Sequence, residues 1–154
     1  MLRGRTSFSP RYAYAMLLAL VALVAFPTAG RAASTLSTYL GTGTGGNTGD
    51  GGPLTNALIN NATGLVWLPD GSMLVSEFSG HRVRKVSPTG VLSTFMGTGA
   101  ASNTGDGGTP AAATINGPRD VAVAPNGTAT DFVLYVSDYT SHVVRRVVVT
   151  TLNP

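Results

Sequence analysis

The sequence predicts an all-β fold, and three observations point to it. Glycine accounts for 20 of the 154 residues, charged residues make up only 11%, and cysteine is absent. Short apolar runs alternate with turn sequences such as "PDG" at residues 69–71, the pattern of strands joined by tight turns. A helical bundle or a charged disordered chain would need far more Lys and Glu. The length sets an upper limit of one modest domain.

Residues 1–33 have a composition of their own. Three arginines precede an unbroken apolar stretch at residues 12–26, and Pro27 and several small residues follow. This order is typical of a secretory signal peptide, with cleavage after Ala32 or at a neighbouring small residue. The apolar run is shorter than the roughly 20 residues of a spanning helix. We expect a secreted protein, with a membrane protein anchored by an uncleaved segment as the alternative.

The positive charge of the chain lies mostly in this leader. Four of the ten basic residues precede residue 34, which leaves six basic residues against seven acidic ones, a net charge of −1. A nucleic-acid partner is not expected, because it would require a basic face. Without cysteine, an exported chain gains no disulfides and depends on its core. Asn61 and Asn126 each begin a tripeptide that could carry an N-glycan in a eukaryotic source.

The chain contains an internal repeat. "LSTYLGTG" at residues 36–43 returns as "LSTFMGTG" at residues 92–99, an offset of 56. After a five-residue insertion in the second copy the offset becomes 61, and "MLVSEFSGHRVRKV" at residues 73–86 aligns with "LYVSDYTSHVVRRV" at residues 134–147. We therefore divide the mature chain into two copies of one unit, residues 34–91 and 92–154.

The glycine-rich loop of each copy resembles a nucleotide-binding loop only superficially. Gly41, Gly43 and Gly46 fit G-x-G-x-x-G, but the second copy has Ser102 in place of the third glycine. "NTGDGGP" follows, which is a poor start for the helix that a dinucleotide fingerprint requires. We expect no nucleotide and no other cofactor.

The aspartates of these loops are candidate calcium ligands. Asp50 and Asp106 each stand alone before two glycines, short of the six to eight oxygens that calcium prefers. The alternative is that both carboxylates accept hydrogen bonds from backbone N–H groups in a tight turn. We favour this structural role and expect no metal.

Each copy is expected to form short strands in a fixed order. The innermost strand is a continuous apolar run, which predicts burial on both faces, with Trp67 packed in the core. At most one helical turn is expected near residue 55 and again near residue 111. The expected strands are residues 64–68, 73–77, 82–86 and 91–96 in the first copy, and residues 120–124, 134–138 and 143–149 in the second. Four strands of graded polarity in a repeat of this length indicate a β-propeller blade.

The repeat resembles NHL-repeat propeller proteins of the type with a "GDGGPAT-A-L" loop before each blade. The matching stretches are "GDGGPLTNAL", "GDGGTPAAATI", "LYVSD" and "HRVRKV", and the resemblance covers nearly all of the mature chain. Ser79-Gly80 before the histidine departs from the family pattern, which tends to have Gly-Asn there. It implies a propeller, but two four-stranded blades make an incomplete ring, since propellers close with four to eight. The second copy also lacks an outer strand after residue 147, and residues 36–40 could serve as an outer strand for another blade. We expect further blades in the same gene product, or self-association.

The repeat positions most suited to chemistry are interpreted as structural. They are Asp50, Asp106, Glu77, Asp138, His81 and His142; the resemblance implies that the histidines and strand carboxylates tie blade to blade. Equivalent residues in successive blades are spread around a ring, so a metal site is not expected. The basic pairs Arg84-Lys85 and Arg145-Arg146 interrupt the alternation of their strands, which favours a bulge or an exposed edge over an anion site.

We find no catalytic motif. The sequence therefore predicts a non-enzymatic scaffold that binds a protein or carbohydrate ligand through its loops. The alternative is a fragment of a metal-dependent propeller lyase or hydrolase whose catalytic residues lie in other blades.

Overall fold

The computed structural model describes residues 34–124 and 130–150. Contacts divide the chain into Met1–Leu36 and Ser37–Pro154, and all the strands lie in the second unit. The described residues form an all-β structure, as the sequence predicted. The elements are η1 (Leu54–Asn56), β1 (Ala62–Trp67), β2 (Met73–Glu77), β3 (Arg82–Val86), β4 (Leu92–Met96), η2 (Pro110–Ala112), β5 (Pro118–Val123), β6 (Phe132–Asp138) and β7 (Val143–Val149).

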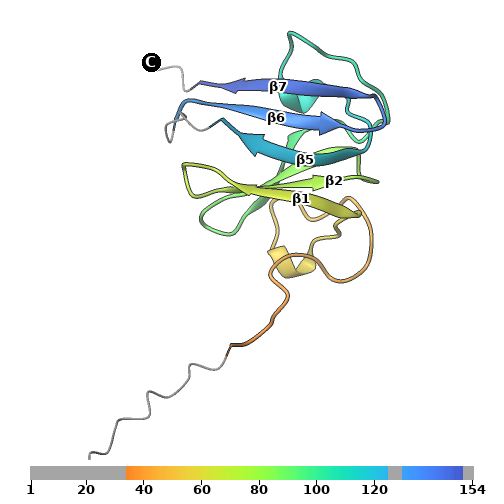
Figure 1. The fold of residues 1–154 in the computed structure, drawn as a ribbon. Helices are drawn as coiled ribbons and strands as arrows, with labels where there is room; N and C mark the ends of the chain where they lie inside the picture. The colour runs from red at the N-terminus through yellow and green to blue at the C-terminus, as the bar shows by residue number, and fades with distance from the viewer. Residues whose placement is uncertain (1–33, 125–129, 151–154) are drawn as a thin grey trace, which may run out of the picture. The chain divides into compact units, whose positions relative to one another are not determined.

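The strands form two antiparallel sheets in which sequence neighbours pair. The first sheet has the order β1-β2-β3-β4 and the second has the order β5-β6-β7 (Figure 1). Every strand expected from the sequence is present to within about two residues. The second sheet has no fourth strand among the described residues, and residues 36–40 adopt no strand there.

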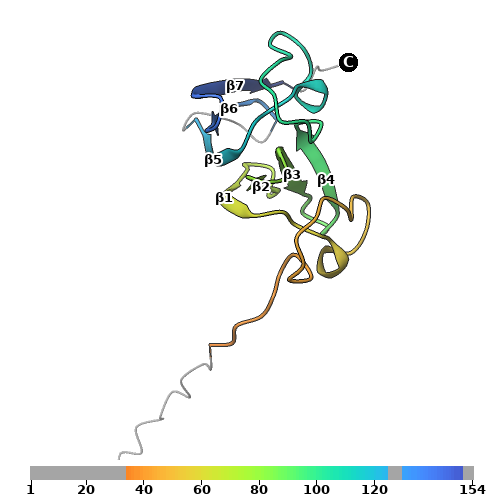
Figure 2. The same cartoon turned by 90° about the vertical axis from the view of Figure 1, so that its right-hand side faces the viewer.

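The two sheets pack face to face around one apolar core (Figure 2). Leu74 and Val83 of the first sheet meet Leu134, Val136 and Val147 of the second. The fit is close at Gly64, where a Cβ would lie 2.7 Å from the carbonyl oxygen of Arg119. The second sheet therefore covers one face of the first.

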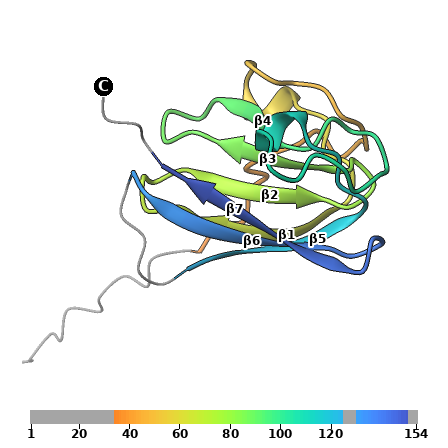
Figure 3. The same ribbon diagram turned by 90° about the horizontal axis from the view of Figure 1, so that it is seen from above.

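A second apolar cluster lies on the opposite face of the first sheet. Met73, Val75, Val86 and Leu92 pack there against the loop that contains Ala57. The 3₁₀ turn η2 lies beside β4 (Figure 3), and η1 packs through Leu54 against the cluster that contains Leu92. Each turn has three residues, which confirms that the expected helical turns are a single turn long. The loop before β1 thus closes one face of the first sheet, and the loop before β5 contacts the end of β4.

The innermost strand of the first copy corrects the sequence prediction. Burial on both faces and core packing of Trp67 are wrong, because Trp67 is 60% exposed and Leu65 is 63% exposed. In an antiparallel sheet alternate residues point to opposite faces. The face of β1 that carries these two side chains is uncovered in the described part of the chain, whereas Val66 packs between the sheets.

Some sequence predictions fall outside residues 34–124 and 130–150. They are the signal segment, the second "PNG" turn and the Asn126 tripeptide. Across the described ranges, no helix has both the length and the apolar character needed to cross a membrane.

Candidate functional site

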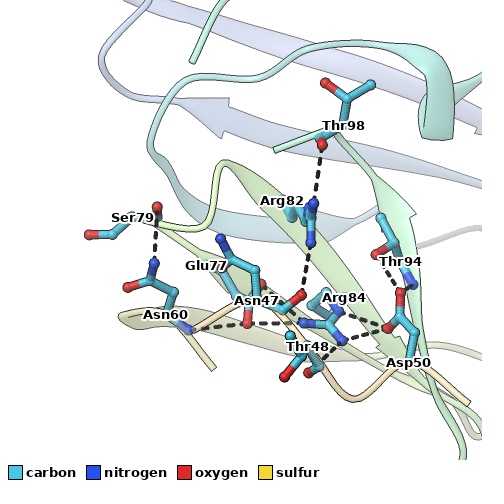
Figure 4. Close-up of polar contacts among 10 residues, drawn as sticks. All are labelled: Asn47, Thr48, Asp50, Asn60, Glu77, Ser79, Arg82, Arg84, Thr94 and Thr98. Atoms are coloured by element: carbon cyan, nitrogen blue, oxygen red, sulfur yellow. Dashed lines mark hydrogen bonds and ion pairs between the residues drawn. The ribbon is translucent and has the colours of Figure 1, made fainter. Parts of the chain in front are cut away.

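A buried arginine organises the first sheet (Figure 4). Arg84 of β3 is fully buried, and its Nη1 lies 3.4 Å from both carboxylate oxygens of Glu77, which is also fully buried. Its Nε donates to Oδ1 of Asp50 at 3.1 Å. The backbone N–H of Asn60 donates to Oε1 of Glu77 at 3.2 Å. One guanidinium therefore joins the glycine-rich loop, the third strand and the second strand.

Asp50 extends this contact to the fourth strand. Its Oδ2 accepts hydrogen bonds from the backbone N–H of Thr94 at 3.1 Å and from the Thr94 hydroxyl at 2.8 Å. Burial raises the pKa of Asp50, but the hydrogen bonds from Thr94 and the charge of Arg84 outweigh it, so the pKa lies below its ordinary value. Burial likewise raises the pKa of Glu77, and there it outweighs Arg84.

The second sheet repeats the arrangement around Arg145. Nη2 of Arg145 lies 2.6 Å from Oδ1 of Asp106, and Nη1 lies 3.7 Å from Oδ2 of Asp138. The backbone N–H of Asn116 donates to Oδ1 of Asp138 at 2.9 Å, as Asn60 does to Glu77. Four of the six repeat positions identified in the sequence thus lie in two equivalent ionic networks.

The networks change the interpretation of the charged residues. Asp50 accepts hydrogen bonds from the side chains of Arg84 and Thr94 as well as from the backbone N–H of Thr94. The expected role as an acceptor of backbone N–H groups in a turn was therefore incomplete. An exposed edge does not explain Arg84, which is buried between carboxylates. The expected bulge is present in the first copy, because the register of β3 and β4 shifts between Val83 and Arg84. The register of β6 and β7 shows no shift at Arg145.

The two histidines occupy equivalent turns but differ in their contacts. His81 (φ +50°) and His142 (φ +59°) are both left-handed. Nδ1 of His81 accepts the backbone N–H of Gly117 at 3.1 Å, a contact from the first copy to the second. The side chain of His142 makes no hydrogen bond within the described residues, so the bond expected there is seen only at His81.

An aromatic and cationic cluster forms where the two copies meet. Phe78 and Tyr139 occupy equivalent positions after the second strand of each sheet, and their ring centroids are 6.1 Å apart. The guanidinium of Arg119 lies 4.0 Å from the Tyr139 ring centroid and 5.6 Å from that of Phe78. Arg119 and Tyr139 are exposed. This cluster was not predicted from the sequence, although both copies have an aromatic residue at this repeat position.

A groove runs beside β7, the last strand of the second sheet. It has a volume of about 290 Å³, and its walls are the loop around Asp106 and the β7 residues from Arg145 onward. In the first sheet, β4 occupies the corresponding edge of β3.

No three His, Cys, Asp or Glu side chains of the described residues gather closely enough to hold a metal ion. Asn61 is exposed, and its Nδ2 donates to the Ser79 hydroxyl at 3.5 Å.

Comparisons with known proteins give a fold and no family. No protein-family model matches the sequence, and no curated protein is similar to it. A "putative phosphatase" of Bacteroides thetaiotaomicron superposes with a TM-score of 0.53 at 23% identity, over 75% of this chain. A protein of unknown function from the same organism gives a TM-score of 0.53 at 25% identity, over 67% of this chain. The chain spans about 26% of the length of each, so it is similar in fold to a quarter of these larger proteins.

Proposed function

We propose that the chain is an exported section of a β-propeller that binds another protein and does not itself catalyse a reaction. The observation that carries this proposal is the cluster of the half-buried Phe78 with the exposed Tyr139 and Arg119, which both copies build together. Aromatic and arginine side chains are enriched in protein interfaces and dominate their binding energy.

The ionic networks support a structural rather than a chemical use of the charged residues. Asp50, Glu77 and Arg84 bond to one another inside the first sheet. In the second sheet Arg145 pairs with Asp106 and lies at a longer ion-pair distance from Asp138. Each network fixes the loop that leads to the inner strand of its sheet. A rigid sheet with positioned turns is the usual support for a binding surface.

A propeller is supported by the stacking of the two sheets. The face of the second sheet that carries Val136 packs on the face of the first sheet that carries Leu74. The corresponding outer faces of this pair expose Trp67 on one side and Val144 on the other. Exposed apolar faces of this kind mark interaction surfaces, and further sheets of the same type fit them.

Binding is tested by probing the full chain against a peptide array and a glycan array. The peptides that bind should lose affinity at least roughly tenfold with Tyr139→Ala or Arg119→Ala, the effect typical of a central interface residue. Val91→Ala is the control, because Val91 is 45% exposed, close to the 51% of Tyr139, and lies outside the cluster. Unchanged binding of both cluster variants would contradict the proposal, and binding to glycans alone would replace the protein ligand by a carbohydrate.

Catalysis and export have their own tests. Hydrolysis of p-nitrophenyl phosphate that depends on the chain would overturn the non-enzymatic assignment. Expression with the natural N-terminus should release a product into the medium that begins at Ala33 or within a few residues of it. Retention of residues 1–32 would favour the anchored form instead.

A further inference from the structure

The outer edge of β7 has the features of a strand-binding site. β7 pairs with β6 along its whole length, and within residues 34–124 and 130–150 no strand pairs with its other edge. The groove of about 290 Å³ lies along that edge. An unpaired edge presents a row of backbone donors and acceptors that another strand can use.

The first sheet shows what such an edge binds. The backbone N–H of Gly51 donates to the carbonyl oxygen of Leu92 at 2.8 Å, and Thr94 donates twice to Asp50. The loop thus binds β4 through one backbone group and one carboxylate. In the second copy the equivalents are Gly107 and Asp106, which line the groove. The Asp106 side chain is 88% exposed, whereas that of Asp50, covered by β4, is 46% exposed.

The chain carries a second segment with the sequence of β4. Residues 36–40 read "LSTYL", and β4 reads "LSTFM", so three of five residues are identical and the other two are similar. Residues 36–39 are exposed and form no strand. A sequence that pairs with β3 in one copy is therefore present without a strand partner in the described chain.

The segment of the same chain lies on the wrong side to reach β7. Leu40 packs against the cluster of Met73 and Val86, on the face of the first sheet that points away from the second sheet. Five extended residues span only about 17 Å. A second copy of the chain is free of this restriction.

We propose that residues 36–40 of a second copy add to β7 as the fourth strand of the second sheet. The register of β3 with β4 places Thr38 opposite Arg145 and Ser37 opposite Arg146. The N–H and hydroxyl of Thr38 then donate to Asp106, as those of Thr94 do to Asp50. The contact joins different surfaces of the two copies, so it builds a ring or an open chain of copies.

The exposed apolar faces of the two sheets are consistent with this arrangement of a donor and an acceptor copy. The donor copy brings its uncovered β1 face, with Leu65 and Trp67, towards the exposed Tyr135 and Val144 of the acceptor. Asp120 is the equivalent in the second copy of Gly64 in the first. A Cβ added at Gly64 would lie within 3 Å of the opposing backbone, so a residue as large as Asp120 does not allow the same close contact. The two faces therefore meet at a wider spacing there than the sheets do within one chain, and the donated strand is the primary contact.

The absence of cysteine makes this contact measurable by disulfide trapping. Full-length chain with Ser37→Cys is mixed with full-length chain with Arg146→Cys and oxidised with diamide. We expect a disulfide-linked heterodimer, since opposite residues of paired strands have a Cα separation that a disulfide tolerates. Ser37→Cys mixed with Thr89→Cys, an exposed turn residue, is the control for random collision. Lys85→Cys with Ser93→Cys in one chain, an observed opposite pair, should close internally.

A strand-breaking variant separates pairing from proximity. Thr38→Pro removes the N–H and the hydroxyl meant for Asp106 and should slow heterodimer formation roughly ten- to hundredfold. Thr35→Pro, outside the segment, should change the rate less than about twofold. A yield no higher than that with Thr89→Cys, or a rate unchanged by Thr38→Pro, would overturn the proposal. Ligand binding at Tyr139 plays no part in this assay, so the two proposals can fail separately.

Discussion

Replacement of Arg84 by Met should remove much of the free energy of unfolding of the chain. Methionine keeps most of the length of the side chain, so the change removes a charge without opening a large cavity. Glu77, itself fully buried, would retain only the N–H of Asn60 at 3.2 Å as a donor. Burial already raises the pKa of Glu77 in the presence of Arg84, and loss of the guanidinium raises it further.

The magnitude follows from the proton that Glu77 must then bind. Its ordinary pKa is 4.5, and each pH unit above that value costs about 1.4 kcal/mol to keep the group protonated. At pH 7 this sets a ceiling of about 3.4 kcal/mol. The contact with the half-exposed Asp50 adds up to about 1 kcal/mol. The sum agrees with the roughly 3–5 kcal/mol lost when one partner of a buried pair is removed.

Urea unfolding followed by far-ultraviolet circular dichroism measures this loss. A carboxyl group whose folded pKa is raised contributes stability below its unfolded pKa, and that stability is lost as the pH rises towards the folded pKa. Arg84→Met should therefore recover roughly 2–3 kcal/mol between pH 7 and pH 5. Glu77→Gln combined with Arg84→Met should lose less than Arg84→Met alone, because Gln keeps an acceptor for Asn60 without a charge. A loss below about 1 kcal/mol at pH 7, or an equal loss at both pH values, would refute the reasoning.

Three further predictions concern contacts between the strands, the loops and the two sheets. The folded pKa of Asp50 is lowered, so its contribution to stability is complete above its ordinary pKa of 3.8 and is lost as the pH falls. Asp50→Asn should therefore make the free energy of unfolding less dependent on pH in the acid range. His81→Ala should destabilise by roughly 1–3 kcal/mol more than His142→Ala, because only the former leaves the Gly117 N–H without its acceptor; equal losses in thermal unfolding would show that backbone strain dominates. Gly64→Ala should cost roughly 1–3 kcal/mol by pushing the sheets apart, whereas Gly45→Ala, with 3.7 Å of clearance, should cost little in the same measurement.

The strands were predictable because their signals are local. Turn sequences and apolar runs of four to seven residues set the strand limits, and the offset of 56 placed the second copy against the first. The ionic networks were not predicted, since Asp50 and Arg84 are 34 residues apart and meet only in the folded sheet. A signal was present nonetheless: an arginine within an apolar strand in both copies, with carboxylates at matching offsets, indicates paired burial.

The error at Trp67 has a different cause. An apolar run indicates that a strand tends to be buried, and it does not indicate which element packs against each face. In the second copy the equivalent Val123 packs against the core, because the first sheet lies next to it. Trp67 has no such neighbour among the described residues. The prediction of a packed inner strand therefore agrees with the structure at Val123 and is wrong at Trp67.

The composition of β7 has a consequence for how the chain must be handled. Five of its seven residues are valine, and Arg145 is turned inward, so Arg146 is the one exposed charge of this strand. A valine-rich edge with one outward charge is close to the sequence profile of segments that nucleate amyloid. Arg146 then has the position of a gatekeeper, and neutralising it should bring the chain out of solution as fibrils at concentrations that the natural sequence tolerates.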